Sequence, residues 1–167
     1  VLALCDVIDP FGKLMSSVTV NLAQGPLLAD LPTQEWQPIG ITALMVDHEI
    51  HPNADAYTAA TGKGYADFTS HGAQAVVAGD ATRVPDAAAD IAARVLEAEY
   101  RHNLLTGQRF IHATVDGAFP FDVCLPDAPE LPAHDQIIAG RAVMTGQVLN
   151  PVGGGCGCGG NCGCGGH

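Results

Sequence analysis

The sequence has 167 residues and a formal net charge of −11, with only seven Lys and Arg residues. Nucleic acids and anionic membrane surfaces are bound by clustered cations, so neither is expected as a partner. No apolar stretch approaches the roughly 18 residues that a membrane span needs, and no signal-peptide pattern is found. Because closely spaced cysteines favour a reducing compartment, these features predict a cytoplasmic protein.

The share of charged residues is low, at 15% of the chain, against roughly 25% in an average soluble domain. Hydrophobic residues make up 47%, many of them alanine. With so few charges to cover the surface, part of the exposed area is expected to be apolar. We therefore predict a homo-oligomer or a subunit of a larger protein complex. The alternative is a small alanine-rich globule.

The first half of the chain is expected to form strands. The run VLALCDVI, the turn DPFGK and the alternating SSVTVNLAQ together predict a β-hairpin. Residues 39–46, IGITALMV, predict a central strand. The segment ADAYTAATG predicts one or two helical turns ended by Gly62, and AQAVVAG predicts a buried strand.

One long helix is predicted over residues 84–107, VPDAAADIAARVLEAEYRHNLLTG. Pro85 suits the first turn of a helix, and Gly107 suits a position just past its end. Residues recurring at three- and four-residue steps form one face of this helix. They are Ala88, Ile91, Val95, Ala98, His102 and Leu105.

The remaining chain predicts strands and a tail. Two strands flank Asp116-Gly117, a strong hairpin dipeptide, and QIIAGRAVMTGQVL predicts a last strand. Strands, one long helix and further strands predict an α+β fold, a mostly antiparallel sheet packed in two layers on one helix. We assign this domain to residues 1–149 and a Gly/Cys-rich tail to residues 150–167.

The tail carries the clearest chemical signal, a C-x-C-x3-C-x-C-x2-H pattern set in glycine. Its donors are Cys156, Cys158, Cys162, Cys164 and His167. Thiolates are soft ligands that suit zinc, copper(I) and iron–sulfur clusters. Glycine permits the backbone bends that let both cysteines of a C-x-C pair bind one metal. The tail is therefore predicted to bind a soft metal ion or an iron–sulfur cluster of unknown identity.

Other interpretations of the tail stay open. Doubled C-x-C pairs resemble the thiolate clusters of metallothioneins more than zinc knuckles, whose usual spacing is C-x2-C. A C-x-C pair can also form a strained, labile disulfide, which fits a redox dithiol. Finally, cysteine among glycines resembles the Gly-Gly-Cys-Gly-Gly ends of sulfur-carrier proteins, which implies a sulfur-carrying arm. A disordered low-complexity tail is the remaining alternative.

A second group of functional candidates follows the central strand in the sequence DHEIH. Alternation places Asp47, Glu49 and His51 on one face of an extended chain and His48 on the other. A carboxylate–imidazole cluster can bind a metal or act as a general base. The alternative is a solvated strand end. His112 lies in an alternating strand and is also a weak catalytic candidate, facing a pocket.

No catalytic set is spelled out, because GxSxG, P-loop and GxGxxG motifs are missing from the sequence. The leading hypothesis is an accessory or subunit protein that binds metal through its tail. The main alternative is a small enzyme with a site near residues 47–51 and a structural metal in the tail.

Overall fold

The computed structural model describes residues 1–79 and 81–149. The strands are β1 (Leu2–Ile8), β2 (Leu14–Leu22), β3 (Ile39–His51), β4 (Phe68–Ser70), β5 (Ala88–His102), β6 (Arg109–Asp116), β7 (Pro120–Leu125) and β8 (Ile137–Val148). The helices are α1 (Gly25–Leu28), α2 (Ala54–Thr61) and α3 (His71–Ala78). Within the described ranges, no helix has the length and apolar character needed to cross a membrane.

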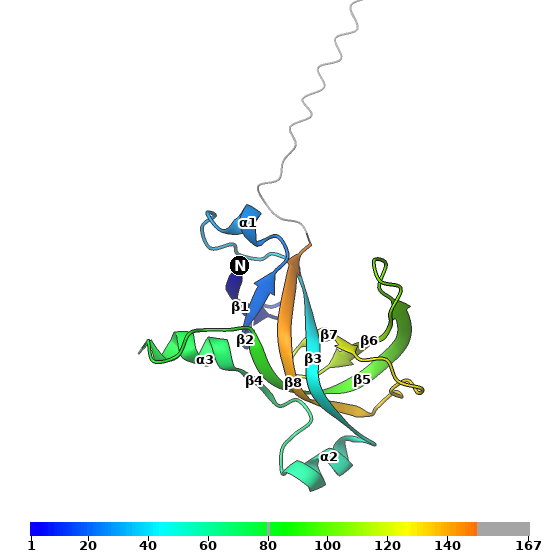
Figure 1. Ribbon diagram of the computed structural model, residues 1–167. Helices are drawn as coiled ribbons and strands as arrows, with labels where there is room; N and C mark the ends of the chain where they lie inside the picture. Colours follow the sequence, from blue (N-terminus) through cyan, green and yellow to red (C-terminus); the bar gives the residue numbers. More distant parts are fainter. Residues whose placement is uncertain (80, 150–167) are drawn as a thin grey trace, which may run out of the picture.

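The sheet closes on itself (Figure 1). β8 pairs with β3 along one edge and with β5 along the other. β5 continues through β6 to β7, and β7 pairs in parallel with β3, which completes the ring. The β1–β2 hairpin extends from the last part of β8, and β4 pairs with the first part of β5.

This architecture contradicts the predicted fold class. Strands account for 49% of the described residues and helices for 14%, so this part of the chain has no long helix to cover a sheet. The sheet is also mixed, because β2–β8 and β3–β7 are parallel pairs. A sheet must bury its apolar face against something. Here that face is buried against other strands of the same closed sheet.

The predicted helix over residues 84–107 is wrong, since most of this segment forms β5. The pairing register between β5 and β6 shifts between Val95 and Glu97, which marks a β-bulge. Before the bulge, Ala89, Ile91, Ala93 and Val95 alternate into the core. A bulge inserts one residue, so the alternation changes phase beyond it.

The phase change explains why the sequence resembled a helix. Asp90 and Arg94 belong to the outward set before the bulge, and Glu97 and Arg101 to the outward set after it. Their spacings are therefore four, three and four residues, which is the spacing of a helix face. Two strand patterns joined by a bulge thus imitate a helical period.

The predicted strand AQAVVAG is also wrong, because it forms most of α3. Ser70 caps this helix, its side-chain oxygen accepting the Ala73 N–H, and Gly79 follows the last turn. Gly72 of α3 allows the helix to approach β2 closely. The Thr19 hydroxyl of β2 and the Asp86 carbonyl occupy the space that a larger side chain at position 72 would need. The capping serine and the glycine were the signals of a helix.

The hairpins and the short helix were predicted correctly. β1 and β2 pair as an antiparallel hairpin, and Asp9 stabilises its turn by accepting the Phe11 and Lys13 N–H groups. β6 and β7 flank the Asp116-Gly117 turn. The predicted central strand forms β3 but continues to His51. α2 forms where helical turns were expected and ends at Gly62.

The core inside the closed sheet is rich in small side chains, which explains the alanine content of the chain. A cylinder of few strands has a narrow interior that small and branched side chains fill. Phe119 is the largest fully buried residue, and its ring packs against Phe68 and Phe121 at centroid distances of 5.2 Å. The buried alanines of this core are Ala43, Ala89, Ala93, Ala113 and Ala142.

Candidate functional site

Three strands lie side by side at the beginning of β8, with the end of β3 on one edge and the beginning of β5 on the other. On one face of this ribbon, directly paired residues form three rows across the strands. The rows are Asp47–Arg141–Asp90, Glu49–Ala139–Ala92 and His51–Ile137–Arg94. Two alanines occupy the middle row, so the longer side chains on either side leave space between them.

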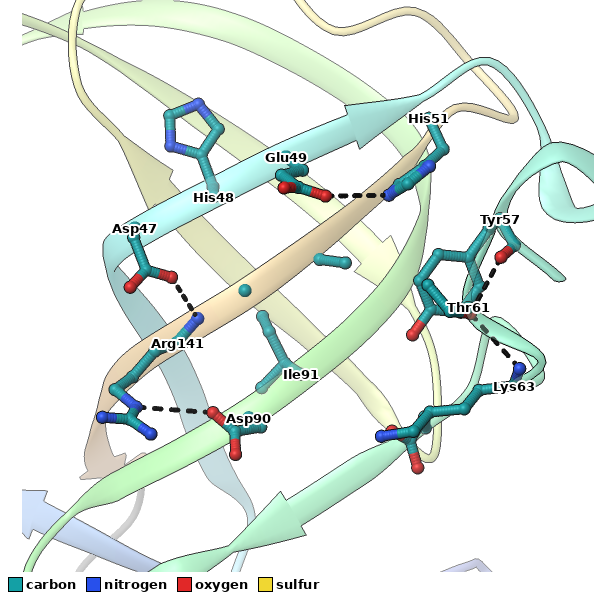
Figure 2. A pocket seen from close by; sticks show the side chains of 13 residues that line it. Asp47, His48, Glu49, His51, Tyr57, Thr61, Lys63, Asp90, Ile91 and Arg141 are labelled. Carbon is teal, nitrogen blue, oxygen red and sulfur yellow. Dashed lines mark hydrogen bonds and ion pairs between the residues drawn. The ribbon is translucent and has the colours of Figure 1, made fainter. Parts of the chain in front are cut away.

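Helix α2 forms a wall beside this face. The helix follows β3 after a two-residue turn, and the Asn53 side chain caps it by accepting the Ala56 N–H at 2.8 Å. Tyr57 packs onto Ala92 and Ile137 in a small second core, which fixes the helix against the sheet. Residues of β3, β5, β8, α2 and the loop after α2 line an open hollow of about 580 Å³ (Figure 2).

A local irregularity of β3 positions Asp47 at the edge of the hollow. The register between β3 and β8 shifts between Met45 and Asp47, next to Gly140. Gly140 has φ +151°, and a side chain there would overlap the main-chain carbonyl of Asp47. The close approach lets Asp47 Oδ1 accept the Arg141 N–H at 3.0 Å. Among the described residues, the second oxygen of Asp47 has no hydrogen-bond partner.

Among Asp47, His48, Glu49 and His51 on β3, His51 is the least exposed to solvent. Its side chain is 14% exposed, whereas the neighbouring Glu49 is 81% exposed. Nε2 of His51 lies 3.5 Å from Oε2 of Glu49, and the ring meets the edge of Tyr57 at a centroid distance of 5.1 Å. This nitrogen is buried and makes no hydrogen bond within residues 1–79 and 81–149. An imidazole beside a carboxylate is a group that can accept or donate a proton.

The two cationic side chains of the hollow already have acidic partners. Arg141 Nε lies 3.4 Å from Asp90 Oδ1, and Lys63 Nζ lies 3.3 Å from Asp67 Oδ2. The other oxygen of Asp90 is 2.8 Å from Nε2 of His71, which ties the beginning of α3 to β5. Four carboxylates and two cations line the hollow, so its field favours positive charge.

The structure places Asp47, Glu49 and His51 on one face of β3 and at the same hollow (Figure 2). His48 lies at the rim but points away from them. His112 is not part of the hollow. It lies on β6, with Nε2 3.5 Å from Asp122 and Nδ1 3.9 Å from Glu99. A functional role for Asp47, Glu49, His51 and His112 stays a prediction.

The described cysteines are separate from each other and from the hollow. Cys5 lies on β1 and Cys124 on β7, and both are free thiols. Burial raises the pKa of each thiol above its ordinary value, assisted by the Asp6 carboxylate beside Cys5 and the Asp122 carboxylate beside Cys124. Within the described part of the chain, no group of three or more His, Cys, Asp and Glu side chains is arranged to hold a metal. The predicted tail ligands Cys156, Cys158, Cys162, Cys164 and His167 lie outside the described residues.

Comparisons with protein-family models, curated proteins and solved structures found no match. The function is therefore inferred from the side chains themselves.

Sequence reasoning missed Tyr57, Lys63, Asp90 and Arg141 as members of the site. Arg141 is a single charge within the apolar segment IIAGRAVM, which was a usable signal, because a charge in a buried strand needs a partner. Asp90 lies within the segment 84–107 that was predicted as a helix and instead forms most of β5. The pairing of β8 with both β3 and β5 brings Arg141 and Asp90 next to Asp47.

Proposed function

We propose that this chain is an accessory or subunit protein whose C-terminal tail binds zinc, copper(I) or an iron–sulfur cluster. The observation that carries the proposal is the pair of C-x-C motifs followed by His167 in a glycine-rich segment. Four thiolates and an imidazole provide enough soft donors to complete a tetrahedral site. Because cysteine binds a metal as the thiolate, binding would release the thiol protons.

The two cysteines of the folded domain support this division of roles. Cys5 and Cys124 are on different strands, and burial raises the pKa of each thiol, which favours the protonated form. A protonated thiol is a poor metal ligand. The thiolates of this protein would therefore come from the tail.

The domain also offers the tail a firm attachment. The Gln24 side chain donates to the Val148 carbonyl at 2.9 Å and accepts the Val148 N–H at 3.2 Å. The Leu149 N–H donates to the Pro38 carbonyl at 2.9 Å. These three hydrogen bonds fix the point of the domain from which the tail continues.

Association with a second copy or with a larger complex is part of the same proposal. Its support is the number of large apolar side chains on the surface, among them Phe11 and Trp36, which are 94% and 67% exposed. A reducing compartment such as the cytoplasm is also part of it, because the tail thiols must stay reduced to bind metal.

Elemental analysis of the anaerobically purified full chain tests the metal proposal, with an absorption spectrum and a thiol count on the same sample. We expect zinc or copper in the native chain, and its loss when the four tail cysteines are replaced by serine. The matched control is the double variant Cys5→Ala and Cys124→Ala, which should keep its metal. Iron with acid-labile sulfide would favour the cluster.

A native chain with no metal and four freely titrating tail thiols would contradict the proposal. The redox dithiol and the sulfur-carrying arm would then be the functions to test. A metal that stays bound in the tail variant but is lost from the Cys5 and Cys124 variant would also overturn it.

A small enzyme at the hollow is the second candidate, with a structural metal in the tail. The observation that favours it is the buried, unbonded Nε2 of His51 beside Glu49. In this hypothesis His51 is the general acid or base, and Asp47 and Glu49 orient the substrate. Turnover of ester, amide or phosphoester test substrates that is lost in His51→Ala, with tail metal unchanged, would support it. Equal turnover in the variant, or none across the panel, would count against it.

A further inference from the structure

We propose that the outer edge of β1 is a dimer interface, at which β1 of one copy pairs antiparallel with β1 of a second copy across a two-fold axis. This inference rests on the part of the proposed function that expects association with a second copy, and it names the surface that would associate. It does not depend on the tail or on its metal.

The main chain of β1 is paired along one side only (Figure 1). Its partner is β2, and the Val1 carbonyl accepts the Leu22 N–H at 2.9 Å. Because main-chain groups alternate in direction along a strand, odd-numbered residues point theirs at β2 and even-numbered residues point theirs outward. The N–H and C=O groups of Leu2, Leu4 and Asp6 therefore lie along the outer edge. Within residues 1–79 and 81–149, no strand pairs with that edge.

The usual protection of a strand edge is weak in β1. Proteins protect such edges with charged side chains, proline or a covering element. Residues 2–8 contain no proline, and Asp6 is their one charged residue. The Asp6 carboxylate is turned toward β2, because it accepts the hydroxyl hydrogen of Ser17, its direct partner on that strand, at 2.6 Å. A charge held in this position does little to keep another strand away.

The two faces of β1 differ, because successive side chains of a strand point to opposite faces. Ala3, Cys5 and Val7 face the core and pack against it. The side chains on the opposite face, with Asp6, are apolar and partly exposed: Leu2 at 36%, Leu4 at 47% and Ile8 at 36%. A strand added at this edge would therefore gain apolar contacts as well as main-chain hydrogen bonds.

A second copy of β1 matches this edge best in one register. With Cys5 opposite Cys5 of the second copy, residues 2–8 are all paired, Leu2 faces Ile8, and Leu4 faces Asp6. Apolar side chains then meet at both ends, and no acidic residue faces another. A register centred on Asp6 would place two carboxylates opposite each other, which is destabilising, and one centred on Leu4 would leave Ile8 unpaired. This self-complementarity is the reason to infer a second copy, and a two-fold contact is the commonest one between identical subunits.

Analytical ultracentrifugation of the full chain tests the interface. A thiol reductant and a metal chelator in the buffer prevent association through tail disulfides or tail metal. We expect a dimer, and Leu4→Glu should weaken it about tenfold or more, because Glu would face Asp6 at both symmetry-related positions. Leu4→Lys should keep the dimer, since Lys would face the same carboxylate with opposite charge. Leu104→Glu, at a fully exposed position between β5 and β6, controls for the loss of a surface leucine and should also keep it.

The register also predicts one specific cross-link. Cys5 directs its main-chain groups at β2, so it would form a non-hydrogen-bonded pair with Cys5 of the second copy. Such pairs have Cα atoms about 4.5 Å apart, within the range of about 4.4–6.8 Å that a disulfide spans. In a chain whose four tail cysteines are replaced by serine, oxidation by diamide should therefore join two copies. Adding Cys124→Ala should leave the cross-link in place, and adding Cys5→Ala should abolish it.

Several results would overturn the proposal: a monomer under the reducing, chelating conditions, equal dimerisation of Leu4→Glu and the native chain, loss of the dimer in Leu4→Lys, or a dimer that gives no cross-link through Cys5. The proposed function fails in a different way. A dimer that Leu4→Glu leaves intact would retain association with a second copy and reject this edge. Metal binding by the tail is decided by the elemental analysis, whatever the oligomeric state.

Discussion

Replacing Gly140 by alanine should destabilise the fold strongly, because the added methyl group meets two separate obstacles. At φ +151° a side chain is strained by about 1–3 kcal/mol. The new Cβ would also overlap the main-chain carbonyl of Asp47, so β3 and β8 would have to separate. Overpacking of this kind costs about 1–3 kcal/mol. The sum, about 2–6 kcal/mol, is a large part of the 5–15 kcal/mol that typically holds a domain together.

Two other glycines provide controls for the two effects. Gly107 has φ +71° but nothing within 4 Å of an added Cβ, so Gly107→Ala should cost about 1–2 kcal/mol from backbone strain alone. Gly64 has an equally open surrounding and no positive φ, so Gly64→Ala should stay within about 0.5 kcal/mol. Urea unfolding followed by circular dichroism gives the three free energies. If Gly140→Ala is no worse than Gly107→Ala, the close approach of β3 to β8 is not as described.

Three further outcomes are expected. Because burial raises the pKa values of Cys5 and Cys124 in the folded state, the unfolded chain loses these protons first. The free energy of unfolding should therefore fall as the pH rises above about 8.5, where the thiols of an unfolded chain titrate, and should be unaffected well below it. Ser70→Ala should cost about 2–3 kcal/mol, because the buried Ser70 oxygen accepts both the Thr19 N–H at 3.1 Å and the capping N–H of α3. Removal of residues 150–167 should leave the urea midpoint of the metal-free chain unchanged, because the hydrogen bonds of β8 end before them.

A specific result would contradict each of these three expectations. The fall in the free energy of unfolding at alkaline pH should become smaller in the Cys5→Ala and Cys124→Ala double variant. An identical pH dependence in that variant would show that other groups cause the fall. Ser16→Ala on β2 is the control for Ser70→Ala, and equal effects would argue against the buried hydrogen bonds as the cause. A lower urea midpoint after tail removal would show that the domain boundary at residue 149 is misplaced.

Local signals of the sequence predicted some elements and not others. The turns at Asp9–Lys13 and Asp116-Gly117 predicted their hairpins, because turn residues act through nearby backbone geometry. The segment of β5 could not be recognised in the same way. The bulge in β5 reverses the alternation of inward- and outward-facing residues part-way along the strand. The resulting three- and four-residue spacing is the same as that of one face of a helix. Only the partners β6 and β8, distant in sequence, decide between the two.

The candidate site shows the same limit. Alternation along β3 correctly grouped Asp47, Glu49 and His51, since they belong to one strand. The opposite side of the hollow comes from β5, which is joined to β3 here through β8, and from α2, whose Tyr57 packs on Ala92 of β5 and Ile137 of β8. Pairing between strands so far apart in the chain has no local sequence signal.

The position of β8 in the chain has a consequence for folding in the cell. This strand is the last one described, yet β2, β3 and β5 all pair with it. During synthesis those three strands leave the ribosome well before the partner they share, and their edges stay open until it arrives. Open strand edges attract other chains. Protection of the nascent chain by a chaperone would therefore matter most in the interval between synthesis of β7 and release of β8.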